Sequence, residues 1–231
     1  HNTLVIVGND IDGISLSKWL KFNTEINIDK RLVIAISLAN ALKTLHLNHL
    51  IHKDITPDNI VYNEDTNQIQ IIDFGIASLL NNEFHNFQNV NQLEGTLSYI
   101  SPEQTGRVNR NLDYRSDLYS YGVVLYELFS GVLPFKEQQE LALVHAHISK
   151  QAIDVREINK KIPKALAKII MKLLSKSADS RYQSSEGLIS DLDTCLYETK
   201  LNNQDFDFEI GKKDSLQVFN IPQKLYGRQE H

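Results

Sequence analysis

Two short polar stretches are the starting point for interpreting this sequence: HKDITPDN at residues 52–59 and DFG at residues 73–75. Two runs of apolar and β-branched residues lie between them, IVY at 60–62 and IQII at 69–72. The polar stretch NEDTN at 63–67 separates these runs, which is typical of a β-hairpin. The sequence therefore predicts two polar loops that flank one small β unit.

The order of the motifs resembles that of the protein kinase family. In HKDITPDN, Asp54 is followed five positions later by Asn59, as in the catalytic loop of that family. Fourteen residues beyond Asn59, DFG begins with Asp73 and resembles the family's magnesium-binding motif. The resemblance implies an α+β, protein-kinase-like fold, with a mainly helical large lobe and small β-hairpin elements.

Further motifs continue the resemblance in the family's order. The stretch GT at 95–96 resembles part of the substrate-docking loop, and SPE at 101–103 resembles the Ala-Pro-Glu motif with serine in the first place. DLYSYG at 117–122 resembles the start of the buried central helix, and Arg181 stands where kinases place the arginine that pairs with the Pro-Glu glutamate. The motifs cover most of residues 4–198, which makes coincidence a poor explanation.

The resemblance implies phosphoryl transfer, with ATP and Mg²⁺ as cofactors and a protein as the substrate. In that picture Asp54 orients the acceptor hydroxyl and receives its proton, with Asn59 beside it in the catalytic loop. Asn59 and Asp73 would hold Mg²⁺, and through it ATP, because a hard cation takes oxygen ligands. The alternative for these three residues is structural, since Asp and Asn commonly form turns.

The resemblance gives the other motif residues supporting roles. Gly75 would let the chain turn sharply, because a glycine has no Cβ to forbid a positive φ. Asp117 would cap its helix, hold the backbone of the catalytic loop, or do both. Lys53 replaces the usual arginine, which keeps the charge but loses the bidentate fork. The supporting set is His52, Lys53, Gly75, Asp117 and the ion pair of Glu103 with Arg181, and Thr96 would serve in substrate docking.

Two departures from the family pattern concern activity. Thr56 stands two positions after Asp54, where serine/threonine kinases usually have a lysine. The 231 residues also contain no G-x-G-x-x-G loop and no strand lysine of the Val-Ala-Ile-Lys type. We therefore interpret residues 1–13 as the last strand and the hinge of a mostly missing N-terminal lobe. We expect the natural start upstream, and little or no turnover from this fragment alone.

Hydrophobic periodicity predicts a helical body for the lobe at 14–199. Apolar residues at steps of three and four predict a helix over 28–46. Another helix should begin at Pro163, whose missing N–H costs nothing in a first helical turn. Further helices are expected over 15–20, 117–130 and 184–197.

Two segments read as irregular. Residues 81–94 are rich in Asn and Gln without periodicity, so we expect a surface loop there. Residues 200–231 are expected to be a linker or extension toward a following domain. Its stretch FNIPQKLYGR at 219–228, together with residues 94–107, is similar to large bacterial signalling proteins. In those proteins a kinase-like domain precedes a P-loop ATPase, sensory modules and a histidine-kinase end.

Composition argues against several kinds of function. A net charge of −5 without a basic cluster is unfavourable for binding nucleic acid. No stretch reaches the ~18 to 20 consecutive apolar residues of a membrane span. Cys195 is the only cysteine, so no internal disulfide can form, and we expect a reducing, cytoplasmic location. His145 and His147 do not share a helix face, which argues against a metal site.

The leading hypothesis is an ATP-dependent serine/threonine protein kinase domain in a larger bacterial signalling protein. The first alternative is a non-catalytic pseudokinase that serves as a docking or regulatory module, which Thr56 and the missing lobe favour. Retention of Asp54, Asn59 and Asp73 argues against it. The second alternative, a kinase acting on a small molecule, would not need the docking loop and the Pro-Glu motif.

Overall fold

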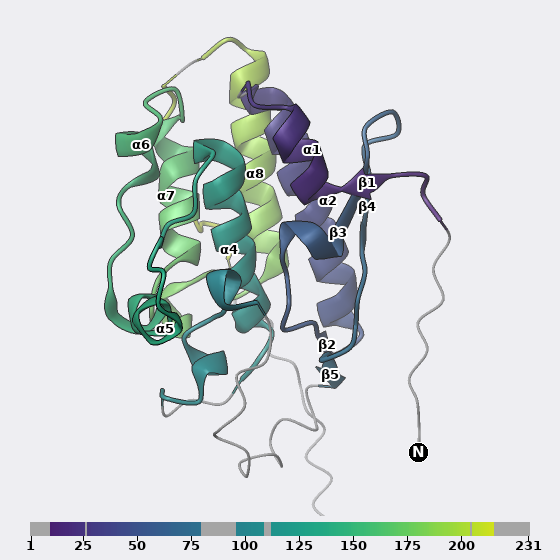
Figure 1. Cartoon of the computed structure of the whole chain (residues 1–231). Helices are drawn as coiled ribbons and strands as arrows, with labels where there is room; N and C mark the ends of the chain where they lie inside the picture. Colours follow the sequence, from purple (N-terminus) through teal and green to yellow (C-terminus); the bar gives the residue numbers. More distant parts are fainter. Residues whose placement is uncertain (1–9, 26, 80–95, 109–111, 204, 215–231) are drawn as a thin grey trace, which may run out of the picture.

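The computed structural model of the protein describes residues 10–25, 27–79, 96–108, 112–203 and 205–214. Helices form most of this part of the chain, and short antiparallel strands gather on one side of them (Figure 1). This arrangement confirms the predicted α+β class, with a mainly helical lobe and small hairpin elements. Residues 1–9 of the predicted strand and hinge, the loop at 81–94 and the motif at 219–228 lie outside the described residues.

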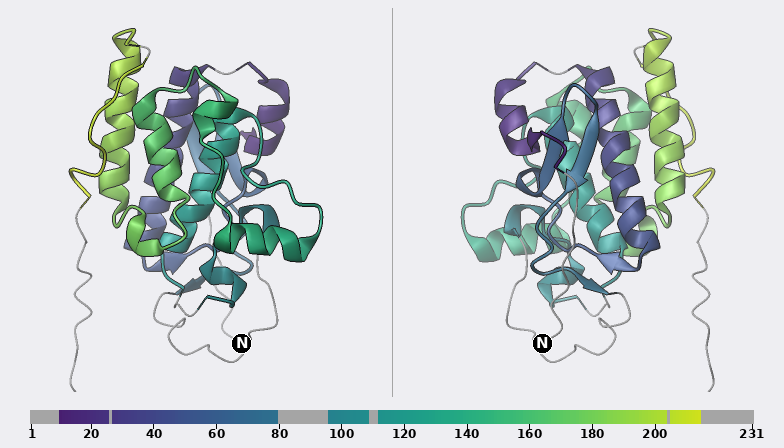
Figure 2. Two further views of the ribbon diagram at one scale, coloured as in Figure 1. Left: turned by 90° about the vertical axis from the view of Figure 1, so that its left-hand side faces the viewer. Right: turned by 90° about the vertical axis from the view of Figure 1, so that its right-hand side faces the viewer.

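Helix α2 (Ile28–Leu47) confirms the helix predicted from periodicity, and it packs along α8 (Ser185–Lys200) over much of its length (Figure 2). The Asn27 side chain accepts a hydrogen bond from the Lys30 backbone N–H, which satisfies one of the free donors at the start of α2. The residues that α2 buries recur at helical spacing, and they are Leu32, Ala35, Leu38, Ala39 and Leu42 among others.

Helix α4 (Arg115–Ser130) is the centre of the hydrophobic core and is buried on nearly every side, as its apolar sequence predicts. It crosses α7 (Lys164–Leu173) closely at Gly122. A Cβ at Gly122 would lie 2.7 Å from the Leu173 Cβ, so no other residue fits between the two helices there. Gly131, at φ 78°, ends α4 in the left-handed conformation that favours glycine.

Shorter helices complete the helical body. The helix predicted to begin at Pro163 is α7, and it begins one residue later, because Pro163 is extended and occupies the N-cap. Within the described residues, none of the helices is long and apolar enough to cross a membrane. The remaining α-helices are α1 (Leu16–Phe22), α5 (Glu140–Ser149) and α6 (Val155–Ile158), and the 3₁₀ turns are η1 (Pro57–Asn59), η2 (Leu97–Tyr99), η3 (Glu103–Thr105) and η4 (Ala178–Ser180).

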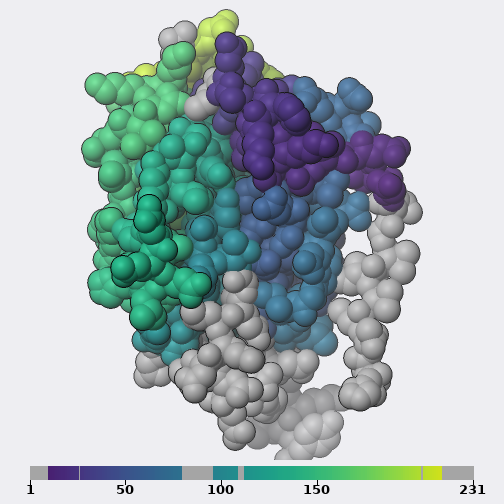
Figure 3. Space-filling view, viewed as in Figure 1, coloured from purple at the N-terminus to yellow at the C-terminus, as the bar shows by residue number. Residues whose placement is uncertain are grey.

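The strands form two small antiparallel groups. In the first, β3 (Ile60–Asn63) lies between β1 (Ile14–Ser15) and β4 (Gln68–Ile71), and the pairing of β3 with β4 confirms the predicted hairpin. The second group pairs β2 (Leu50–Ile51) with β5 (Ser78–Leu79). Helix α1 (purple) lies against the blue segment that contains the hairpin in Figure 3, and its Trp19 packs edge-on against Tyr62 of β3.

The segment at 205–214, part of the predicted linker or extension at 200–231, packs onto the lobe. It runs back along α8 (yellow in Figure 2) and buries Phe206, whose carbonyl accepts a hydrogen bond from Ala165 N. At its end the Asp214 carboxylate accepts hydrogen bonds from Gln183 N and Ser184 N at 2.9 Å, at the start of α8. Phe206, Phe208 and Ile210 recur at every second position, but so short an alternation in a polar stretch does not by itself predict what it packs against.

Candidate active site

The hairpin β3–β4 brings the stretches 52–59 and 73–75 together. Thr56 opens η1, and its Oγ1 accepts a hydrogen bond from Asn59 N at 3.4 Å. The Asn59 carbonyl then accepts from Ile72 N at 2.9 Å, one residue before Asp73. A backbone hydrogen bond therefore ties the end of the first stretch to the beginning of the second.

Asp54 is the meeting point of the predicted site residues. Its Oδ2 accepts a hydrogen bond from the Asn59 side-chain amide at 2.8 Å, and the same amide nitrogen donates to the Asp54 carbonyl at 3.0 Å. Its Oδ1 accepts from the backbone N–H of Thr96 at 2.8 Å. The structure thus brings Asp54, Asn59 and Thr96 into direct contact, and Asp54 stays half-buried.

Asp73 lies two residues beyond the end of β4 and is exposed to solvent. Its backbone takes the left-handed conformation with φ 62°, and its Oδ1 accepts from Gly75 N at 3.2 Å. The sharp turn therefore occurs at Asp73, and the expectation of a positive φ at Gly75 is wrong. Aspartate tolerates this conformation better than most side chains do, because its short carboxylate bonds the nearby backbone.

Asn59 and Asp73 supply oxygen donors of the kind that Mg²⁺ prefers. The Asn59 amide nitrogen is directed at Asp54, so the amide oxygen points away from that carboxylate. The Asp73 carboxylate is solvent-exposed. Mg²⁺ commonly binds proteins through one or two such groups and keeps water or phosphate oxygens for the rest of its shell. Within the described residues, no group of three His, Cys, Asp or Glu side chains could hold a metal ion.

Asp117 holds the backbone at the beginning of the stretch 52–59. Its side chain is fully buried; Oδ2 accepts from His52 N at 3.0 Å, and Oδ1 accepts from Lys53 N at 2.9 Å. Asp117 lies inside the first turn of α4, where Tyr114 occupies the N-cap, so the capping alternative is wrong. Sequence reasoning missed His46, whose Nε2 lies 2.9 Å from the same carboxylate, because α2 brings it there only in the folded chain.

The His52 imidazole joins the two loops. Its Nδ1 accepts from Asp54 N at 3.3 Å, so its Nε2 carries the hydrogen that reaches the Ile72 carbonyl at 3.0 Å. The ring also contacts Phe74 edge-on at 4.8 Å between centroids. His52 therefore lies behind Asp54 as a neutral bridge between the loops.

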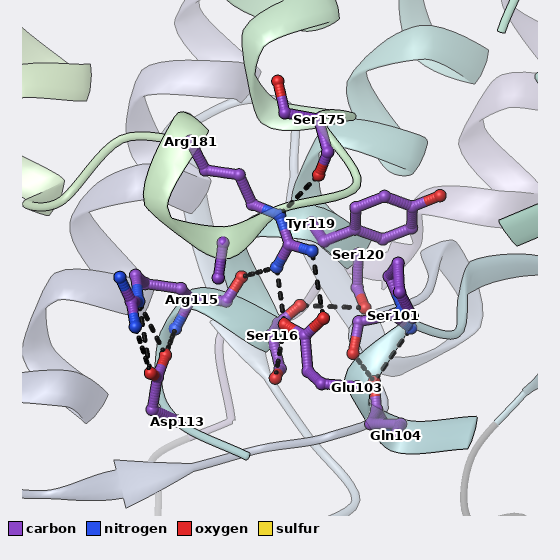
Figure 4. Close-up of polar contacts among 12 residues, drawn as sticks. Ser101, Glu103, Gln104, Asp113, Arg115, Ser116, Tyr119, Ser120, Ser175 and Arg181 are labelled. Atoms are coloured by element: carbon purple, nitrogen blue, oxygen red, sulfur yellow. Dashed lines mark hydrogen bonds and ion pairs between the residues drawn. The ribbon is translucent and has the colours of Figure 1, made fainter. Parts of the chain in front are cut away.

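Glu103 and Arg181 form a buried ion pair with two contacts, Nη1 to Oε1 at 2.5 Å and Nη2 to Oε2 at 3.0 Å (Figure 4). Arg181 is 0% exposed. Its remaining N–H groups donate to the carbonyls of Ser175, Arg115 and Lys176, so all five guanidinium donors are used. The pair fastens the loop that carries SPE to the turn before α8.

The two histidines of α5 have different environments. His147 is fully buried, and its Nδ1 lies 3.1 Å from the Tyr119 hydroxyl. Burial, assisted by the nearby Lys176 ammonium, lowers the pKa of His147 to about 4. His145 is exposed and contacts Ser149.

Comparison with known proteins adds the following. Residues 1–191 match the family model described as the protein kinase domain. A probable serine/threonine-protein kinase of Clostridium acetobutylicum is 35% identical over 191 residues, which are 83% of this chain and 28% of the relative. The serine/threonine-protein kinase PrkC of Bacillus subtilis is 28% identical over 206 residues, 88% of this chain and 31% of the relative.

One further relative is named a histidine kinase and not a serine/threonine-protein kinase. The hybrid signal transduction histidine kinase G of Dictyostelium discoideum is 30% identical to this chain, and the match covers 91% of the chain but 9% of the relative. The matched part is 28% of the Clostridium acetobutylicum relative, 27% of a relative from Clostridium perfringens and 34% of one from Lactococcus lactis. The chain thus spans about a third or less of the curated relatives that it matches.

Proposed function

Because this chain belongs to the protein kinase domain family, we propose that it transfers the γ-phosphoryl group of ATP to a serine or threonine hydroxyl of a protein substrate. The observation that carries the proposal is the geometry of Asp54. Its carboxylate is held by Asn59 and by the Thr96 backbone, and it is half-buried at the junction of the two loops. A carboxylate held in this way is suited to orient a hydroxyl and to take its proton.

Each residue has a separate part in this proposal. Each Asp54 oxygen already accepts one hydrogen bond, and a carboxylate oxygen has a second lone pair for the incoming hydroxyl. Asn59 and Asp73 would hold Mg²⁺, which when bound bridges phosphate oxygens and neutralises their charge. Thr96, whose backbone contacts Asp54, is well located to contribute to substrate docking.

The proposal also covers the larger protein. The Gly-rich loop and the strand lysine are not among the 231 residues, so we expect both from an N-terminal lobe that residues 1–13 join to this one. In this proposal the lobe comprises residues 14–199. Residues 205–214 pack on it and begin the extension toward other domains of the same chain. We propose that the kinase works in the cytoplasm and that this piece alone has little or no turnover.

One observation favours a second candidate, a non-catalytic pseudokinase module. Thr56 occupies the position of the usual lysine, is 2% exposed, and uses its hydroxyl to cap η1. It therefore supplies no cation near a transferred phosphate. Such a module would use the same fold as a docking or regulatory surface.

The test is transfer of labelled γ-phosphate from Mg-ATP to a Ser/Thr-rich protein by the full-length natural protein. Asp54→Asn should reduce transfer by about 10²- to 10⁴-fold, because the amide cannot take the proton. The matched control is Asp65→Asn, which removes an exposed carboxylate in the turn between β3 and β4 and should leave transfer unchanged. Equal transfer by the wild type and the Asp54→Asn variant would favour the pseudokinase.

A further inference from the structure

Gln104 links the loop that carries Ser-Pro-Glu (101–103) to the stretch 52–59 through its side-chain amide. Its Nε2 donates to the Lys53 carbonyl at 2.6 Å. Its Oε1 accepts from Ser101 N at 3.1 Å and from Ser101 Oγ at 2.9 Å (Figure 4). A backbone N–H only donates and a carbonyl only accepts, so these partners determine which way the amide points.

The backbone that Gln104 contacts is unusual and lies directly before Asp54. Lys53 has φ 69°, which lies in the left-handed region of backbone conformation. Residues other than Gly, Asn and Asp rarely adopt this region. Its N–H donates to Asp117 Oδ1 at 2.9 Å, while its carbonyl accepts from Gln104. Lys53 is therefore held from α4 at its N–H and from the Ser-Pro-Glu loop at its carbonyl.

We propose that Gln104 is a positioning residue for Asp54. It keeps the Lys53 carbonyl, and with it the peptide bond to Asp54, in the orientation that directs the Asp54 carboxylate toward Asn59 and Thr96. Its partner Ser101 is fully buried, so the loop end of this link is anchored in the fold. Through Gln104, the loop next to the docking residue Thr96 sets the geometry of the proton acceptor. This inference rests on the proposed kinase function.

The decisive variant is Gln104→Met in the full-length protein, since methionine keeps the length of the side chain and removes both hydrogen-bonding atoms. We expect kcat to fall about 10- to 100-fold, because a misplacement of about 1 Å can cost that much. The KM for ATP should stay close to wild type, because the proposed Mg²⁺ ligands do not change. The Tm should fall modestly, because the buried Ser101 loses the acceptor of its N–H and its hydroxyl. The matched control is Gln151→Met, at an exposed glutamine after α5.

The Gln104→Glu variant distinguishes a positioning role from a purely structural one through the pH dependence of its kcat. Glutamate still accepts from Ser101, but the ionised form cannot donate to the Lys53 carbonyl. Its kcat relative to wild type should therefore rise as the pH is lowered toward 6 and the carboxyl takes up a proton. A constant ratio across pH, or a Gln104→Met kcat equal to that of Gln151→Met, would overturn the proposal.

Failure of the proposed function is distinguishable from failure of this inference. If the wild type transfers no phosphate while folded, the kinase function fails. Amide hydrogen exchange of residues 50–59 then tests the link itself: Gln104→Met should speed exchange there and leave α2 and α8 unchanged. Unchanged exchange at 50–59 would show that Gln104 does not hold this backbone, and the inference would fall as well.

Discussion

The ion pair of Glu103 with Arg181 and the two predicted site carboxylates, Asp54 and Asp73, are all charged side chains. They differ in how many of their hydrogen-bonding atoms already have partners inside the protein. Arg181 is 0% exposed, and all five of its N–H groups have partners inside the protein. Asp54 is half-buried and Asp73 is exposed. Buried charges with every donor used can only support the fold, whereas partly exposed carboxylates retain lone pairs for a ligand.

The energetic consequence follows from desolvation. A buried ion pair adds little net stability compared with apolar residues, but losing one partner leaves an unpaired charge away from water. When an exposed carboxylate is replaced by an amide, no buried charge is left without a partner. We therefore expect substitutions at the buried pair to act on stability, and the Asp54→Asn substitution to act on phosphate transfer with little effect on stability.

The largest expected effect on stability is that of Arg181→Met. It should lower the free energy of unfolding by about 3 to 5 kcal/mol, because Glu103 remains buried without its partner. Urea denaturation would measure it. The matched control is Arg156→Met, whose partner Asp205 is about half exposed, and it should lower the stability far less, because solvent screens the pair.

A double substitution tests the reason for that effect. Glu103→Gln added to Arg181→Met should restore part of the stability, since it removes the orphaned charge and keeps an acceptor for Ser116 Oγ, 2.9 Å from Glu103. A double variant as unstable as Arg181→Met alone would mean that lost packing, and not the unpaired carboxylate, causes the destabilisation.

The next effect is a pH dependence at His147, which neighbours the pair through Tyr119. Its pKa is about 4 in the folded protein, against a usual value of 6.5, because burial and the Lys176 ammonium disfavour the imidazolium. Between these values the unfolded chain binds more protons, so stability falls as the pH drops from 6.5 toward 4. This contribution is up to about 3 kcal/mol.

Thermal or urea unfolding between pH 4 and 7 would check it. His147→Asn should flatten the pH dependence in this window, and His145→Asn, at the exposed histidine of the same helix, should leave it unchanged. An unchanged slope in His147→Asn would mean that other groups account for the acid sensitivity.

The smallest effect on stability is expected at the start of α8, which Asp214 holds. Its carboxylate accepts from Gln183 N, Ser184 N and Ser184 Oγ. Asp214→Ala should lower the free energy of unfolding by about 1 to 2 kcal/mol, the range for losing a helix-terminal acceptor. Urea denaturation measures it, with Asp207→Ala as an exposed control in the same segment. Equal stability of the two variants would mean that the Asp214 carboxylate does not stabilise the start of α8.

Much of the fold could be predicted because local patterns agree with it. The steps of three and four over 28–46 correspond to α2, and the two β-branched runs pair as β3 and β4. Elsewhere local signals were too weak. Phe206, Phe208 and Ile210 alternate with acidic residues, but this run of five residues is too short to distinguish an irregular segment from a strand. The left-handed turn occurs at Asp73, where the aspartate carboxylate accepts a hydrogen bond from Gly75 N.

By itself, the sequence determined the order of the motifs, the helical class of the lobe and the residue types that phosphoryl transfer requires. Only the tertiary structure decided which side chains meet: His46 and Asp117, Gln104 and Lys53, Asp214 and the start of α8. The partners are separated by 71, 51 and 31 positions respectively. Helix and strand periods relate neighbours in the chain, whereas such contacts depend on how the helices and loops pack against each other.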